Sequence, residues 1–187
     1  MQELINSYLD YSSKINSLLN VNEIIKFVGA LKKAQGLKKK VLIVGNGGSA
    51  STASHFATDL GVGTLKVSEP VRAISLVDNS AIVTAVSNDI NFTTVFSQQI
   101  EVLAEPNDLL VLISASGNSA NLISAYETSK SLGMESFSLT GFDGGKLRTL
   151  MNENNVHVPS KIGQYGLVED AHLAICHIAT ECIRKIK

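Results

Sequence analysis

Two short segments of the sequence have the composition of a loop that binds an anion. Residues 45–49 read Gly-Asn-Gly-Gly-Ser, and residues 114–121 read Ser-Ala-Ser-Gly-Asn-Ser-Ala-Asn. Glycine allows backbone N–H groups to close on an anion, and a helix that starts there adds the positive end of its dipole. Three serines at one junction are more than helix capping requires, so residues 114–121 predict a phosphate-monoester site. Residues 45–49 alone could be a ligand loop or a tight turn.

Two further segments each carry a histidine and a carboxylate in a helical context. His55 and Asp59 are four residues apart and share one face of a helix. Glu169 and His177 are eight residues apart, which leaves them two turns apart on a broadly common face, whereas His172 is expected to point elsewhere. Either pair alone could be an ion pair or a hydrogen-bonded core histidine. Together the four side chains are a plausible zinc set or a general acid/base group.

Other polar junctions are ambiguous. Residues 78–80 could cap a helix that Asn88 and Asp89 end, and residues 140–145 have the composition of a turn followed by a helix start. His157 lies in a short apolar run and is expected to be structural.

The scaffold that must position these residues is an alternation of short apolar runs and helical segments. Runs that are apolar on both faces and alternate with helices are typical of buried parallel strands. The sequence therefore predicts an α/β fold, a doubly wound parallel sheet of five strands, whose ligands bind beyond the carboxyl ends of the strands. The expected strands are 41–44, 73–77, 109–113, 137–140 and a weaker 156–158, and the expected helices are 49–60, 80–87, 91–104, 119–132, 145–152 and 166–186.

The first part of the chain has helical rather than strand periodicity. Apolar residues recur at helical spacing over residues 2–33, with candidate caps at Asn20 and Asn22, so two helices are expected. We predict one domain over 1–187, divided into a helical extension (1–36) and an α/β core (37–187). The apolar stripe of the extension needs a covering surface, which predicts a tetramer with its sites at subunit boundaries.

Composition excludes several classes of protein. The 16 Lys and Arg residues are balanced by 17 Asp and Glu residues, so the chain lacks the basic excess of a nucleic-acid-binding surface. The first residues carry two acids before any apolar run, unlike a signal peptide, and no apolar stretch approaches the ~18 residues that span a bilayer. Cys176 and Cys182 lie on opposite-leaning sides of a helix, which makes a mutual disulfide unexpected. A cytoplasmic protein is therefore expected.

Taken together, these motifs resemble the sugar isomerase (SIS) domain proteins, and specifically the phosphoheptose isomerase family. The resemblance runs nearly end to end and rests on the two N-terminal helices, 45–49, 55–57, 88–89, 116–119, 140–141, 143–145, His172 and His177. It implies a flavodoxin-like sheet in a homotetramer. It also implies conversion of sedoheptulose 7-phosphate to D-glycero-D-manno-heptose 7-phosphate through an enediol, often with zinc.

The resemblance assigns roles by position. It implies a metal site formed by His55, Asp59, Glu169 and His177. Of these, Asp59 or Glu169 would remove the proton next to the carbonyl, and His177 would move a proton at the oxygen end. Substrate contacts are expected from Asn46, Gly47, Gly48, Ser49, Asn88, Asp89, Ser114, Ala115, Ser116, Ser119 and Glu169, with the three serines 114, 116 and 119 on the phosphate.

This chain departs from the family pattern at three positions. The family has glutamate where this chain has Asp59, glutamine where it has Glu169, and threonine where it has Ala115. Aspartate is one methylene shorter, which withdraws the carboxylate by ~1 Å. The first two changes could compensate one another, or they could mark a different aldose–ketose phosphate pair.

The alternative to an isomerase is a non-catalytic SIS module that binds a phosphosugar or a protein. One relative of this kind binds the bacterial replication initiator, and it lacks the carboxylate near position 59 and the histidine near position 177. This chain keeps both Asp59 and His177, which favours the enzyme.

Overall fold

Five parallel strands form the centre of the computed structural model, which describes residues 1–66 and 69–186. The strand order is β2-β1-β3-β4-β5, and every neighbouring pair is parallel. This is the flavodoxin-like order of a doubly wound sheet, so the predicted fold class is confirmed. The strands are β1 (Lys40–Gly45), β2 (Arg72–Ser75), β3 (Leu109–Ser114), β4 (Glu135–Thr140) and β5 (Asn155–His157).

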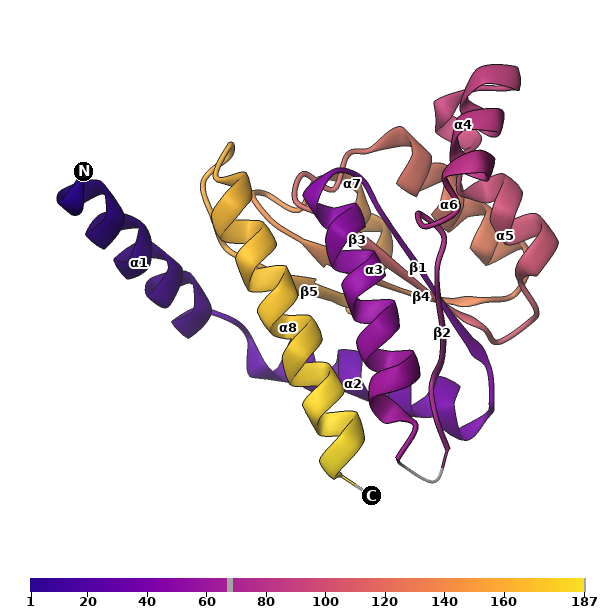
Figure 1. Cartoon of the computed structure of the whole chain (residues 1–187), viewed down its shortest axis with the longest axis horizontal. Helices are drawn as coiled ribbons and strands as arrows, with labels where there is room; N and C mark the ends of the chain where they lie inside the picture. Colours follow the sequence, from indigo (N-terminus) through magenta and orange to yellow (C-terminus); the bar gives the residue numbers. More distant parts are fainter. Residues whose placement is uncertain (67–68, 187) are drawn as a thin grey trace.

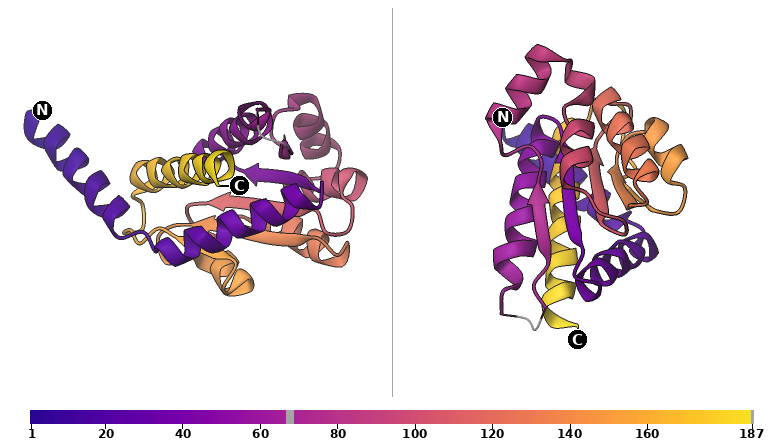
Figure 2. Two further views of the ribbon diagram at one scale, coloured as in Figure 1. Left: turned by 90° about the horizontal axis from the view of Figure 1, so that it is seen from below. Right: turned by 90° about the vertical axis from the view of Figure 1, so that its right-hand side faces the viewer.

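Helices cover both faces of this sheet (Figures 1 and 2). On β1, Val41 and Ile43 face a core completed by α2 (Val21–Gly36), α3 (Gly48–Gly61) and α8 (Tyr165–Lys185). Leu42 and Val44 face the opposite core, which contains α5 (Ser97–Leu103), α6 (Ala120–Ser131) and α7 (Gly145–Met151). Burial on both faces explains why these strands are continuous apolar runs.

Two predicted elements are shorter than expected. The helix expected over 91–104 is divided into the 3₁₀ turn η2 (Phe92–Thr94) and α5. Asn91 causes the division, because its side chain accepts a hydrogen bond from the Thr94 N–H and starts a separate turn. The strand expected over 73–77 ends at Ser75, and α4 (Ser80–Asp89) begins after the Asn79 cap.

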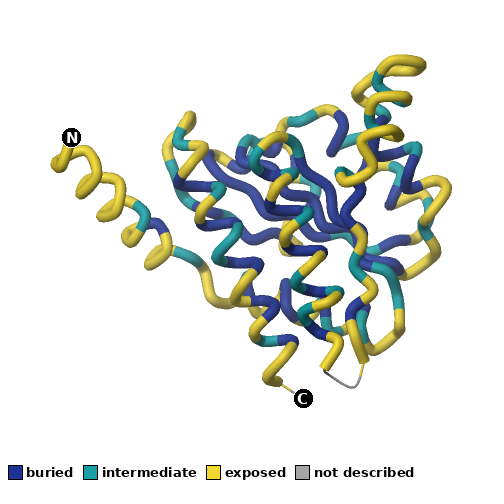
Figure 3. The backbone as a smooth tube through the Cα atoms, viewed as in Figure 1, coloured by how far each residue is buried: buried dark blue, intermediate teal, exposed yellow. Residues whose placement is uncertain are grey.

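The predicted pair of N-terminal helices is present, but its two members differ in their packing. Helix α1 (Gln2–Ser17) projects from the body and is largely exposed, whereas α2 packs against the sheet and buries Phe27 and Leu31 (Figures 1 and 3). The Tyr8 hydroxyl on α1 donates a hydrogen bond to Asp170 on α8 at 2.7 Å. Only α1 therefore has the character of an extension, and α2 belongs to the helical layer of the core.

Among the described residues, no helix is long and apolar enough to cross a lipid bilayer.

Candidate active site

The two predicted anion loops lie side by side at the carboxyl edge of the sheet. They follow β1 and β3, which are paired so that Gly45 is opposite Ile113. Of the helices that begin at this edge, three border the two loops: α3 at Gly48, α6 at Ala120 and α8 at Tyr165. The unpaired N–H groups of helix starts attract negative charge, so the edge is suited to an anionic ligand.

A cavity of about 160 Å³ opens between these loops and helix starts. Seven of the residues expected to contact substrate line it, from both loops and from α8. Ile113 and Tyr165 also line it and were not expected. The full lining is Asn46, Ser49, Ile113, Ser114, Ala115, Ser116, Ser119, Tyr165 and Glu169.

The serines of the second loop play different local roles. The Ser114 hydroxyl accepts a hydrogen bond from the Gly117 N–H, and the Ser116 hydroxyl accepts one from the Asn118 N–H. Ser119 occupies the N-cap position of α6, yet its side chain makes no capping hydrogen bond. Gly117 has a φ of +64°, and a Cβ atom there would overlap the Gly144 carbonyl, so only glycine fits this turn. The loop thus presents hydroxyls around a fixed backbone turn, as a phosphate site requires.

The Glu169 side chain lies against the start of α3. A Cβ atom at position 48 would overlap its carboxylate, so the glycine at this position leaves the space that the carboxylate occupies. A negative charge is favourable near the first turn of a helix. The same carboxylate lines the serine cavity, so it adds a negative charge, and a proton acceptor, to a site otherwise suited to an anion.

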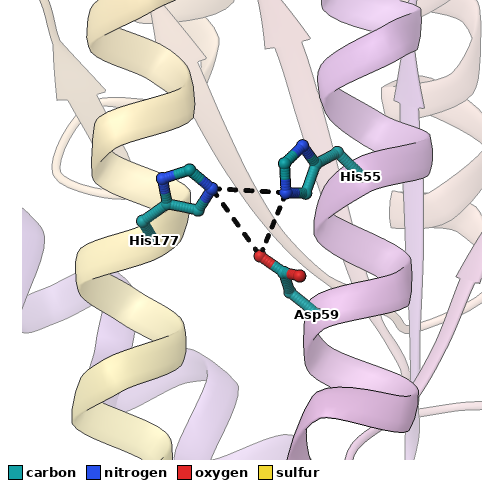
Figure 4. Close-up of side chains that lie close together, drawn as sticks. All are labelled: His55, Asp59 and His177. Atoms are coloured by element: carbon teal, nitrogen blue, oxygen red, sulfur yellow. Dashed lines mark hydrogen bonds and ion pairs between the residues drawn. The ribbon is translucent and has the colours of Figure 1, made fainter.

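His55, Asp59 and His177 form a compact group between α3 and α8 (Figure 4). The two histidine Nε2 atoms are 3.3 Å apart, and Asp59 Oδ2 is 3.4 Å from His55 Nε2 and 3.8 Å from His177 Nε2. The side chains of the two histidines are about half exposed, at 47% and 50%. A small ligand or ion can therefore reach the group from solvent.

The donor atoms fit a zinc ion. Zinc binds imidazole nitrogen and carboxylate oxygen at about 2.0–2.2 Å in tetrahedral geometry, which places its ligand atoms about 3.3 Å apart. The three separations in this group are close to that value. Two imidazoles and one carboxylate also match the three protein ligands of a catalytic zinc, which keeps one position open.

Cys176 precedes His177 in the sequence but is not a further ligand of this kind. Burial, together with the negative charge of Asp59, raises the pKa of its thiol far above the ordinary value. Its side chain is fully buried and lies outside the three-residue group.

The parallel course of α3 and α8 explains which residues meet. The two helices run in the same direction, with Glu169 beside Gly48 at one level and His177 beside His55 two turns further along (Figure 1). Eight residues of helix correspond to about 12 Å, so Glu169 lies apart from the three-residue group. Both helices pack side by side on one face of the same sheet, so the three-residue group forms within one chain.

Four expected substrate contacts are outside the residues that line the cavity. Two of them, Gly47 and Gly48, belong to the first loop, and Gly48 faces the Glu169 carboxylate. Asn88 and Asp89, at the end of α4, are exposed, hydrogen-bonded to each other and outside the residues that line the cavity. Tyr165 was missed, although it stands one helical turn before Glu169 and therefore shares its face. Its ring packs edge-on against Phe142, with 4.9 Å between ring centroids, which holds it at the rim of the cavity.

Comparison with known proteins agrees with the geometry. Residues 7–141 match the family model of the SIS domain. The phosphoheptose isomerase of Helicobacter pylori is 44% identical over 147 residues, which cover 78% of this chain and 74% of that protein. The chain belongs to the phosphoheptose isomerase family of SIS-domain proteins. The solved phosphoheptose isomerase of Neisseria gonorrhoeae superimposes with a TM-score of 0.89 at 29% identity over 99% of both chains. That of Francisella tularensis gives a TM-score of 0.87 at 29% identity over 98% of both chains.

Family membership places the cavity and the three-residue group in an isomerase fold. The cavity and the three-residue group lie near one another because α3 and α8 each contribute residues to both.

Proposed function

We propose that this protein is an aldose–ketose isomerase that converts sedoheptulose 7-phosphate to D-glycero-D-manno-heptose 7-phosphate. The observation that carries the proposal is the pairing of the serine-lined cavity with the His55–Asp59–His177 group on the same two helices. Family membership supplies the substrate class. A phosphate bound by the serines would place the rest of the sugar within reach of acid/base groups.

In this mechanism the residues of the chain carry the proton transfers. A carboxylate, Asp59 or Glu169, removes the proton next to the carbonyl, and His177 moves a proton at the oxygen end of the enediol. Asp59 lies beside His177, whereas Glu169 lines the cavity itself, and this separation supports a different role for each carboxylate.

The proposed cofactor is zinc, held by His55, Asp59 and His177. When bound, zinc supplies a Lewis acid that polarises the carbonyl and diol oxygens. Glu169, which the sequence suggested as a fourth ligand, lies outside this group and is not part of the proposed zinc site.

The proposed assembly is a homotetramer. Leu4, Ile5 and Leu9 of α1 are 77%, 54% and 61% exposed, and a second copy of the chain would cover this stripe. We also propose a cytoplasmic location, in keeping with the phosphorylated substrate.

Turnover on a panel of pentose, hexose and heptose phosphates tests this function. We expect isomerisation of sedoheptulose 7-phosphate, with loss of activity after chelation and recovery on addition of zinc. Tight binding of a sugar phosphate without turnover of any member of the panel would instead favour a non-catalytic SIS module.

The phosphate site makes a prediction of its own. Ser116→Ala removes a hydroxyl that lines the cavity, together with the hydrogen bond that it accepts from the Asn118 N–H, whereas the Gly117 N–H keeps its hydrogen bond to Ser114. A hydrogen bond to a charged group contributes about 1.5–3 kcal/mol, so we expect the dissociation constant for a sugar phosphate, measured by calorimetry, to rise about 10- to 100-fold. Ser131→Ala, an exposed serine at the other end of α6, is the matched control. Equal affinities of the two variants would remove Ser116 from the phosphate site.

A further inference from the structure

The side-chain amides of Asn46 and Asn121 form a reciprocal pair beneath the cavity. Each Nδ2–H donates to the Oδ1 of the other residue, and both distances are 2.9 Å. Asn46 follows β1 and lines the cavity, whereas Asn121 lies in the first turn of α6 and is not among the lining residues. The pair therefore joins the two anion loops directly through side chains.

The pair is largely removed from water, which increases its importance. Asn121 is only 2% exposed, and a buried amide that loses its partner costs more than the hydrogen bond contributes when it is present. An amide offers two N–H donors and an oxygen with two acceptor sites. Because pairing uses one donor and one acceptor site of each residue, neither amide can turn over without the other.

We propose that Asn121 is a positioning residue that fixes the Asn46 amide for the substrate. The inference rests on the proposed isomerase function and on Asn46 as a substrate contact. Asn46 keeps one N–H and one acceptor site beyond the pair, and its place in the cavity lining directs them toward a bound sugar phosphate. Asn121 touches no substrate; it acts by setting the orientation of Asn46 and the spacing of the two loops.

A double-mutant cycle on Asn46 and Asn121 tests this role. We expect Asn121→Ala and Asn46→Ala each to lower kcat/KM for sedoheptulose 7-phosphate by about 10- to 100-fold, since misplacement of a positioning group by about 1 Å has an effect of that order. If Asn121 acts through Asn46, the double variant is no worse than Asn46→Ala alone. Losses that multiply in the double variant would overturn the inference.

A conservative variant separates pairing from packing. Asn121→Leu keeps a side chain of similar size but removes both hydrogen bonds of the pair, so its kcat/KM is expected to be as low as that of Asn121→Ala if pairing and not packing carries the effect. Asn155→Ala is the matched control for a lost buried amide, because Asn155 is 4% exposed, accepts hydrogen bonds from Ser138 and Thr140, and is outside the residues that line the cavity. It should lower stability and leave kcat/KM unchanged. An equal kinetic loss in Asn155→Ala would assign the effect of Asn121 to stability and overturn the inference.

A readout that needs no activity keeps the two proposals distinguishable. In protein labelled with ¹⁵N asparagine, the Asn46 side-chain amide proton that is donated to Asn121 is expected to be protected from exchange with water and to lose this protection in Asn121→Ala. Absence of wild-type turnover would overturn the proposed function alone. Absence of protection at this proton in the wild type would overturn the inference alone.

Discussion

Replacement of His177 by alanine is expected to lower kcat for sugar-phosphate isomerisation by about 10²- to 10⁴-fold, the usual contribution of a positioned acid/base group. The residue lies within 4 Å of both His55 and Asp59, so its loss also removes one of three donors to the proposed zinc ion. The cavity that would bind phosphate is formed by other residues. We therefore expect the dissociation constant for the sugar phosphate to be largely unchanged.

The measurement is single-turnover kinetics on the zinc-loaded protein, together with zinc content per chain and calorimetric binding of the sugar phosphate. His157→Ala is the matched control, because His157 is half-buried in β5 and contacts Thr140 rather than the three-residue group. The acid/base assignment would be contradicted if His177→Ala retained more than about a tenth of wild-type kcat at full zinc occupancy.

Much of the fold could be predicted because the sheet is buried on both faces. Runs such as 41–44 and 109–113 are apolar at every position, and their alternation with helices leaves few topologies other than a doubly wound sheet. In this topology ligands bind at the carboxyl edge of the sheet. The serines of 114–121 follow a strand at this edge, so they could be assigned to a binding site from the sequence. The break at Asn91 was harder to predict, because the helical pattern continues through it and a single side-chain hydrogen bond starts the separate turn.

The details of the site depend on relationships that the sequence does not contain. Helical spacing placed His55 with Asp59, and Glu169 broadly with His177, but it could not show that α3 and α8 are neighbours on one face of the sheet within one chain. Their packing places Glu169 at Gly48, two turns from His177. The pairing of Asn46 with Asn121 likewise depends on β1 and β3 being neighbours in the sheet. For Asn88 and Asp89 the sequence suggested a contact that this chain does not make: the family motif at the end of α4 lies outside the cavity.

A buried histidine on α8 predicts a marked loss of stability in acid. His172 is fully buried, and neither of its ring nitrogens has a hydrogen-bond partner among the described residues. Burial lowers the pKa of this imidazole from its usual value near 6.5 to about 4 in the folded protein. The unfolded chain therefore binds a proton at a higher pH than the folded chain does.

The lowered pKa of His172 makes the protein less stable in acid. Between pH 6.5 and about 4 the unfolded state holds more protons at position 172, so the free energy of unfolding falls as the pH falls. A pKa difference of this size corresponds to about 3 kcal/mol by pH 4, at 1.36 kcal/mol per unit. Above pH 7 the histidine is neutral in both states and contributes no pH dependence.

Urea unfolding of the wild type and of His172→Leu across pH 4–7 isolates this contribution, because leucine does not titrate and the remaining groups are common to both proteins. We expect the difference between the two pH profiles to reach about 3 kcal/mol by pH 4, with the wild type losing more stability than the variant. Parallel profiles would show that His172 acquires a proton in the folded state without cost.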